Sequence, residues 1–139
     1  MWWTYALLSA VFAALTAVLA KSGVKGVDAN VATAVRTAVV LVLAWVVVAV
    51  QGNLGAVAGI PRASLGFLIA SGLATGASWL FYFKALQAGP VTLVSAVDKS
   101  SLALTLILAA AILGESLTVK TAIGCSLIIA GTAVIVWPS

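Results

Sequence analysis

Long apolar segments alternate with short polar ones along this chain. The five apolar segments cover residues 2–20, 31–50, 64–86, 91–113 and 119–137. Each is close to the roughly 20 residues that an α-helix needs to cross a bilayer. They are longer than the roughly 10-residue strands of a membrane barrel and lack the alternation of such strands. The pattern predicts one domain over residues 1–139, built from five transmembrane helices.

The ends of the segments carry residues that are typical of helix ends. Asp28 or Asn30 is expected to cap the second helix, and Ser64 the third, because short polar side chains accept hydrogen bonds from first-turn N–H groups. Gly114 suits the end of the fourth helix. The first segment has no Lys or Arg before its apolar run, unlike a signal peptide. We therefore expect it to remain as a membrane span.

Composition supports a membrane environment. Hydrophobic residues make up 64% of the chain and charged residues 7%, with a mean hydropathy of +1.27. Soluble domains contain about 25% charged residues. A soluble enzyme, a disordered segment and a disulfide scaffold are therefore excluded. The fold class that we predict is all-α, a polytopic membrane protein with the lipid bilayer as its solvent.

The charged and reactive residues limit the chemistry further. The seven basic residues lie singly between Lys21 and Lys120, whereas nucleic-acid binders cluster them, so no nucleic-acid partner is expected. The chain has no His and a single Cys125, which excludes His-based catalysis, a multi-Cys metal site and an internal disulfide. We expect no enzyme activity, no metal and no cofactor. Coupling to protons or other ions stays open.

The basic residues near the helix ends bear on topology. Lys21, Lys25 and Lys84 are expected on one side of the membrane, and Arg62 and Lys120 on the other. Three against two is a weak orientation signal under the positive-inside rule. Insertion in both orientations would give such a bias, and so would chance in a short protein.

Three ionisable residues lie well inside predicted spans, where charge is unfavourable and commonly functional. They are Arg36, Asp98 and Lys99. At 1.5 Å per residue, Arg36 and Asp98 should both lie about 6–8 Å from the midplane, on the same side. Trp79 falls at a similar depth. The predicted substrate or coupling site consists of Arg36, Trp79, Tyr82, Ser95, Asp98 and Lys99.

Two interpretations of the deep charges are open. Asp98, as the only deep carboxylate, could exchange protons or bind a cation, or Arg36 and Asp98 could simply neutralise each other to hold two helices together. Consecutive helical residues diverge by about 100°, so Lys99 is expected to face away from Asp98. The three residues leave one excess positive charge, which allows an anionic or zwitterionic substrate.

Glycines form two candidate packing faces. Gly72 and Gly76 continue into Trp79 and Phe83 at helical spacing on the third segment, a pattern more typical of helix packing than of a binding site. Gly124 and Gly131 share one face of the fifth segment. That face suits contact with another helix, including one from a second chain.

The chain resembles a known family over essentially all 139 residues, and most specifically in the last 60. Four segments carry the resemblance: FYFKALQAGPV at 81–91, LGESLT at 113–118, the pair Ile123-Gly124 and the triplet Ala130-Gly131-Thr132. These segments resemble EamA-like domains of the drug/metabolite transporter superfamily. Arg36 matches a basic residue often seen early in that family's second helix. The VDKS sequence at 97–100 is similar to short members that have one domain.

The resemblance implies an EamA-type half-transporter unit and an exporter of metabolites or drugs that works by alternating access. Most members carry two five-helix domains in tandem, the second inverted relative to the first. A single unit can reproduce such an inverted repeat by pairing with an oppositely inserted copy. The resemblance therefore implies an antiparallel homodimer in a prokaryotic inner membrane, with a parallel dimer or a monomer as alternatives. The deep acidic residue of the more distant small multidrug resistance family, on the first helix, has no counterpart here.

The sequence thus supports two hypotheses about function. The first is a secondary transporter whose partner is a small-molecule substrate. The second is a small membrane subunit or scaffold that transports nothing. A scaffold should tolerate apolar replacement of Arg36 and Asp98, since such replacement is often neutral for a buried ion pair.

Overall fold

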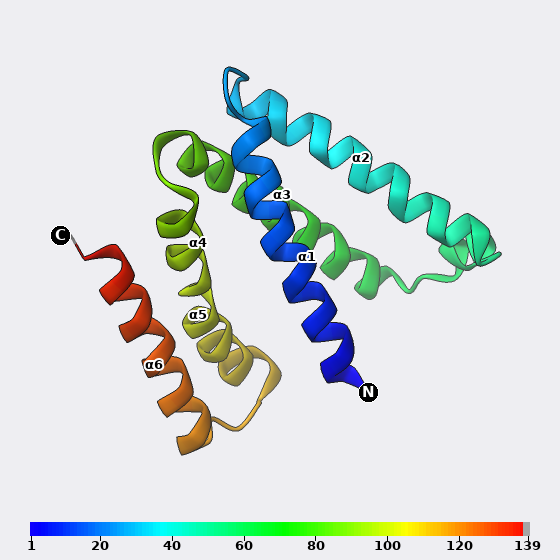
Figure 1. Ribbon diagram of the computed structural model, residues 1–139. Helices are drawn as coiled ribbons and strands as arrows, with labels where there is room; N and C mark the ends of the chain where they lie inside the picture. The colour runs from blue at the N-terminus through cyan, green and yellow to red at the C-terminus, as the bar shows by residue number, and fades with distance from the viewer. Residues whose placement is uncertain (138–139) are drawn as a thin grey trace. The chain divides into compact units, whose positions relative to one another are not determined.

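The computed structural model describes residues 1–137, which are helical apart from short connections and contain no strand. Five helical segments are long and apolar enough to cross a membrane: Trp2–Gly23, Ala29–Val50, Arg62–Ala88, Val91–Leu113 and Val119–Val136. The predicted all-α, five-span fold is therefore confirmed. The chain divides into two compact units, one covering Met1–Ala88 and the other starting at Gly89. Figure 1 shows the helices of both units.

The first unit consists of three long helices and one short one. These are α1 (Trp2–Gly23), α2 (Ala29–Val50), the 3₁₀-helix η1 (Leu54–Gly59) and α3 (Arg62–Ala88). Helix α3 packs against both α1 and α2. Gly26 in the α1–α2 loop and Gly52 before η1 have positive φ angles of 73° and 72°, which favour glycine at these tight turns.

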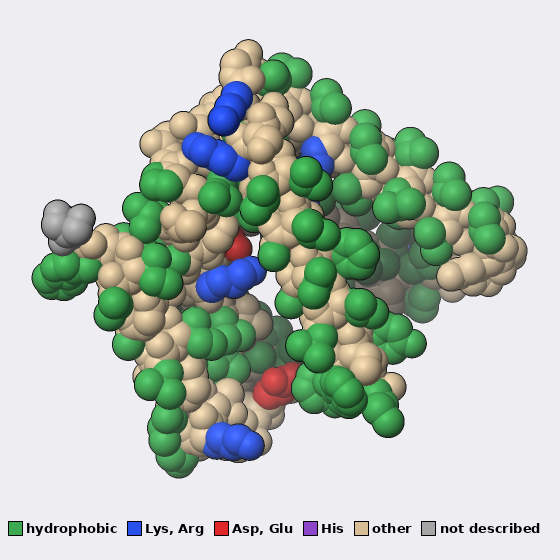
Figure 2. All heavy atoms as spheres, viewed as in Figure 1, with side chains coloured by type: hydrophobic (Ala, Val, Ile, Leu, Met, Phe, Trp, Pro, Cys, Tyr) green, Lys and Arg blue, Asp and Glu red, His purple; other side chains and the backbone are tan. Residues whose placement is uncertain are grey.

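Two long-range hydrogen bonds tie the end of α3 to the end of α1 and the following loop. The Lys21 ammonium donates to the Leu86 carbonyl, and the Gln87 side-chain amide donates to the Val27 carbonyl at 2.5 Å. Leu86 itself is fully buried. These contacts bring the end of α1, the start of α2 and the end of α3 to one end of the unit. Basic side chains are visible near the α1–α2 loop in Figure 2.

The helix starts agree with the sequence at α2 and differ at α3. Asp28 caps α2, because its carboxylate accepts hydrogen bonds from the N–H groups of Asn30 at 2.9 Å and Val31 at 3.1 Å. The prediction that Ser64 caps the third helix is wrong. Helix α3 begins at Arg62, and the Pro61 carbonyl accepts the first helical bond, from the Leu65 N–H at 2.9 Å. Proline is favoured at a helix start, because the N–H groups there have no partner within the helix and proline has no N–H to leave unpaired.

The second unit contains α4 (Val91–Lys99), α5 (Ser101–Leu108), the π-helical turn η2 (Ala109–Leu113) and α6 (Val119–Val136). The fourth span is thus interrupted at Ser100 instead of forming one regular α-helix. Gly114 ends it in the left-handed conformation, with φ of 68°, as the sequence predicted. Thr118 caps α6 by accepting from the Thr121 N–H at 3.2 Å. Helix α6 packs against both α4 and α5.

The surface of the described chain is largely apolar. Large hydrophobic side chains along every span are exposed, for example Phe12 at 64%, Val42 at 62% and Leu127 at 68%. Green hydrophobic side chains cover much of the face visible in Figure 2, and charged ones are few. Water would not tolerate continuous apolar surface of this extent, whereas hydrocarbon does. The exposed faces therefore fit contact with lipid.

The Asp28 cap gives a first testable prediction. The Asp28→Ala variant should lower the free energy of unfolding by about 1 kcal/mol, because two first-turn N–H groups lose their acceptor. Reversible unfolding in mixed detergent–SDS micelles measures the change. The Asp28→Asn variant is the matched control, since asparagine caps equally well. If Asp28→Asn were destabilised as much as Asp28→Ala, the carboxylate charge would matter and the cap would not.

Candidate functional site

The first unit holds a guanidinium group against aromatic rings inside the membrane-spanning segments. The Cζ atom of Arg36 on α2 lies 4.1 Å from the centre of the Trp79 ring on α3 and 5.6 Å from that of Phe83. Arg36 and Trp79 are half-buried, and Phe83 is only 3% exposed. We call Arg36, Trp79 and Phe83 the arginine platform.

The positions of these residues along antiparallel helices explain why they meet. Arg36 lies seven residues after the first residue of α2, and Trp79 nine residues before the last residue of α3. At 1.5 Å per residue these offsets are about 10–14 Å from the same end of the unit. Trp79 and Phe83 are four residues apart, so their side chains lie on one face of α3. The sequence placed Arg36 and Trp79 at a common depth, and the structure brings them together.

Tyr82 borders the arginine platform. Its ring meets the Phe83 ring edge-on, with centroids 6.5 Å apart and planes inclined at 68°. Tyr82 is half-buried. The sequence analysis included Tyr82 but assigned Phe83 only to a packing stripe. The four-residue spacing from Trp79 was the signal that could have added Phe83 to the site.

Within the first unit, the charge of Arg36 has no carboxylate partner. No hydrogen bond or ion pair joins its side chain to another group of residues 1–88. The faces of aromatic rings carry partial negative charge, and a cation over such a face gains about 0.5–2 kcal/mol, more when water is absent. The arginine platform thus stabilises the positive charge without neutralising it, and leaves the guanidinium N–H groups available.

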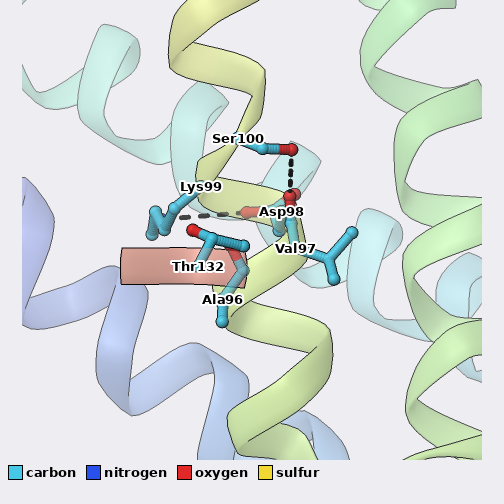
Figure 3. A network of polar contacts seen from close by, with 6 residues as sticks. All are labelled: Ala96, Val97, Asp98, Lys99, Ser100 and Thr132. Atoms are coloured by element: carbon cyan, nitrogen blue, oxygen red, sulfur yellow. Dashed lines mark hydrogen bonds and ion pairs between the residues drawn. The ribbon is translucent and has the colours of Figure 1, made fainter. Parts of the chain in front are cut away.

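The second unit contains a different polar cluster, at the end of α4. The Lys99 ammonium lies 3.8 Å from a carboxylate oxygen of Asp98, with the two side chains 67% and 44% exposed (Figure 3). The expectation that Lys99 faces away from Asp98 is wrong. The 100° between consecutive residues separates the Cβ atoms, but the four-carbon lysine stem is long enough to bend back. Lys99 also lies in the last turn of α4, where the helix dipole favours a cation.

The backbone changes its hydrogen-bond pattern beside this ion pair. The Ser100 N–H donates to the Val97 carbonyl at 3.0 Å, and the Ala103 N–H donates to the Ser100 carbonyl at 3.0 Å. Both bonds span three residues, as in a 3₁₀-helix, which in the middle of a long helix often marks a functional hinge. The Ser100 hydroxyl also donates to the Val97 carbonyl, at 2.6 Å. We call residues 97–103 the Ser100 break.

A hydroxyl from α6 bonds to the backbone at the Ser100 break. In a regular α-helix the Ser100 N–H would donate to the Ala96 carbonyl. Here the Thr132 hydroxyl donates to that carbonyl, at 3.2 Å (Figure 3). Hydrocarbon offers no donor for a freed carbonyl, so a neighbouring Ser or Thr commonly supplies one. Thr132 was not a predicted site residue. The polar DKSS sequence inside an apolar segment was a signal for the break, but not for its partner.

The predicted site residues thus fall in two groups. Arg36, Trp79 and Tyr82 belong to the first unit, and the half-buried Ser95 belongs to the second with Asp98 and Lys99. Whether the two groups form one site, and whether Arg36 pairs with Asp98, stay predictions.

The glycines predicted for helix packing have open surroundings in the described chain. A Cβ atom added at any of them would meet no heavy atom within 4 Å outside the immediate backbone, which holds for Gly72, Gly76, Gly124 and Gly131. Their role in packing, within the chain or against a second one, also stays a prediction.

Five apolar helices with ionisable side chains at depth define a polytopic α-helical membrane protein. The chain belongs to the EamA-like transporter family, which matches residues 1–137. A protein from Sinorhizobium sp, described as an uncharacterized transporter in the cobO 3′ region, is 45% identical over 130 residues, covering 94% of this chain and 92% of that protein. No solved structure matches the chain. The resemblance identified in the sequence is thereby confirmed.

The bond between Thr132 and Ala96 gives the second prediction. The Thr132→Val variant keeps the shape of the side chain and removes the donor, so it should lower the free energy of unfolding by about 1 kcal/mol. Unfolding in mixed micelles measures the effect, and Thr132→Ser should restore most of the loss. Thr105→Val is the matched control, because the Thr105 hydroxyl donates only within its own helix, to the Ser101 carbonyl. Equal losses in Thr132→Val and Thr105→Val would contradict the assigned role.

Proposed function

We propose that this chain is a secondary transporter, exporter-like, that moves small metabolites or drugs across a prokaryotic inner membrane by alternating access. The observation that carries the proposal is the Arg36 guanidinium, held over Trp79 and Phe83 inside the spans of an EamA-like family member. A charge at that depth with no carboxylate partner in its own unit is unfavourable for a protein that only needs to be stable. A transporter needs such a group, because it gives the substrate a polar contact inside the membrane.

Each candidate residue has a role in this mechanism. Arg36 contacts the substrate, with Trp79 and Tyr82 as neighbouring wall. Asp98 couples transport to protons or another cation, and Lys99 modulates its charge through the 3.8 Å ion pair. Ser95 contributes a hydroxyl to the same path. The Ser100 break supports the assignment of Asp98, because interrupted helices commonly hold the ion and substrate sites of secondary transporters.

The transporting assembly in this proposal is an antiparallel homodimer. Two oppositely inserted copies reproduce an inverted repeat around a site near the midplane. The Sinorhizobium relative is matched over 92% of its length, so it has no room for a second five-span unit. Lys21, Lys25 and Lys84 against Arg62 and Lys120 give only a weak orientation bias, which permits both insertions. The open glycine faces of α3 and α6 offer surfaces for helices of a second copy.

Proton coupling through Asp98 is the third prediction. Proteoliposomes that contain a pH-sensitive dye should show proton flux when an organic acid, an amine or a neutral metabolite from a panel is transported. The Asp98→Asn variant should reduce the flux driven by an active compound by about tenfold or more, since proton relays at functional sites contribute at least that much. The initial rate of dye response, at equal protein incorporation, measures the effect.

The control for this experiment is Asp28→Asn, which removes a carboxylate outside the membrane and keeps the α2 cap. It should transport at the parental rate. Parental flux in Asp98→Asn would refute the coupling role of Asp98. Absence of flux with every compound, in the parent as well, would favour the scaffold hypothesis instead.

Dual topology is the fourth prediction. Single cysteines at Ser22 and Asn53, introduced separately into a Cys125→Ala background, lie in exposed positions at opposite ends of the first unit. In intact cells a membrane-impermeant maleimide should label about half of each population, because the two insertions are nearly balanced. Gel-shift labelling before and after permeabilisation measures the fractions. Neither substitution removes a basic residue, so the orientation signal is preserved.

Labelling at only one of the two positions in intact cells would refute dual insertion. Changing the charge bias between the two sides of the membrane provides a second check. The Lys25→Gln variant should make the numbers of Lys and Arg residues on the two sides equal, and should shift the labelled fraction at both positions towards one half. A fixed orientation would leave the labelling of both positions unchanged.

A further inference from the structure

The arginine platform has a chemistry that defines a class of ligand more narrowly than transport does. Arg36 carries five N–H donors in a rigid, planar group. Both Trp79 and Phe83 contact this group within ring-stacking distance, at 4.1 and 5.6 Å. These rings stabilise the charge of the guanidinium but accept no ordinary hydrogen bond from its N–H groups. Within the first unit, no residue accepts a hydrogen bond from the Arg36 side chain.

We propose that Arg36 recognises a carboxylate of the substrate, through two parallel N–H···O bonds from its guanidinium. This inference rests on the proposed transport function and names the substrate class. A guanidinium and a carboxylate match as planar forks, and such bidentate pairs are the strong, geometrically specific form of ion pair. The rings hold the guanidinium in place before the ligand arrives, which reduces the side-chain entropy lost on binding.

Within the first unit, the number of positive charges at this depth favours one carboxylate over a phosphate dianion. The other basic residues of the first unit lie near the ends of its helices: Lys21, Lys25, Arg62 and Lys84. Lys21 already donates to the Leu86 carbonyl. A single guanidinium balances a single negative charge, whereas a dianion would keep one uncompensated charge inside the hydrocarbon.

The depth of Arg36 argues against a lipid phosphate as the ligand. Arg36 lies three to four residues from the centre of α2, which is about 5 Å along the helix axis. Lipid phosphates lie outside a hydrocarbon core of about 30 Å, so about 15 Å or more from the midplane. An arginine at this depth usually extends its side chain towards the interface. Here Trp79 and Phe83 hold the guanidinium against α3 instead.

Binding to the purified full-length protein in detergent tests the proposal without requiring transport. The probes are carboxylates paired with their neutral amides: benzoate with benzamide, phenylacetate with phenylacetamide, and hexanoate with hexanamide. Inorganic phosphate and phosphatidylglycerol are added as competitors, to test whether a phosphate group binds at the same site. Isothermal titration calorimetry should show at least one carboxylate binding about tenfold or more tightly than its own amide, a difference of one charge-assisted hydrogen-bonded pair. Phosphate and phosphatidylglycerol should compete weakly.

Three variants assign the preference to Arg36. Arg36→Gln should abolish it, so that acid and amide bind equally. Arg36→Lys keeps the charge but not the fork, and should keep only part of the preference, which also gives a result if Arg36→Gln fails to fold. Arg62→Gln is the matched control, because it removes an exposed arginine at the start of α3, and it should bind like the parent.

The proposal is overturned if no carboxylate is preferred over its amide, if Arg36→Gln keeps the preference, or if phosphate or phosphatidylglycerol displaces the carboxylate at equal concentration. Its failure can be separated from failure of the transport function. Flux of neutral or cationic compounds with no carboxylate preference would leave transport intact and remove this ligand class. Carboxylate binding without flux in proteoliposomes would leave the site intact and remove transport.

Discussion

Hydrocarbon provides no hydrogen-bond partner, and this constraint governs every polar group in the spans of the protein. Regular helix satisfies nearly all backbone groups internally, which is why the described chain is helical. Polar side chains follow the same rule. The hydroxyls of Thr33, Thr37 and Thr75 donate back to carbonyls of their own helices. In the described residues, Arg36 and the Ser100 break depart from this pattern, and the sequence singled out Arg36 and, at the break, Asp98 and Lys99.

Arg36 and the Ser100 break stabilise their polar groups in hydrocarbon in different ways. At the Ser100 break, the Thr132 hydroxyl replaces the backbone partner of the Ala96 carbonyl, and the Ser100 hydroxyl adds a second bond to the Val97 carbonyl. At Arg36, the aromatic rings stabilise charge without accepting a hydrogen bond in the ordinary sense. The first arrangement is complete within its unit, while the second leaves donors exposed. This difference is why the arginine, more than the break, is assigned to ligand recognition.

Sequence reasoning succeeded where a single helix decides the outcome. Segment length and hydropathy predicted all five spans, and local chemistry predicted the caps at Asp28 and Gly114. Depth arithmetic placed Arg36 level with Trp79, because two antiparallel helices share an end. Sequence reasoning failed where a bond joins two helices or where a side chain bends. Thr132 on α6 contacts Ala96 on α4, and Lys99 turns back to Asp98. Helical periodicity gives the direction of a Cβ atom, not the reach of a flexible side chain or the partner of a freed carbonyl.

The division of the fourth span into α4 and α5 has a mechanical consequence. A continuous α-helix bends sharply only by losing backbone bonds, and kinks occur where a side chain replaces them. At the Ser100 break that replacement is already in place, because hydroxyls of Ser100 and Thr132 hold the carbonyls concerned. A change in the angle between the two halves of the span would therefore stretch hydroxyl bonds instead of unwinding a turn. The Ser100 break is thus the point at which the fourth span would bend, and it contains both Asp98 and Lys99.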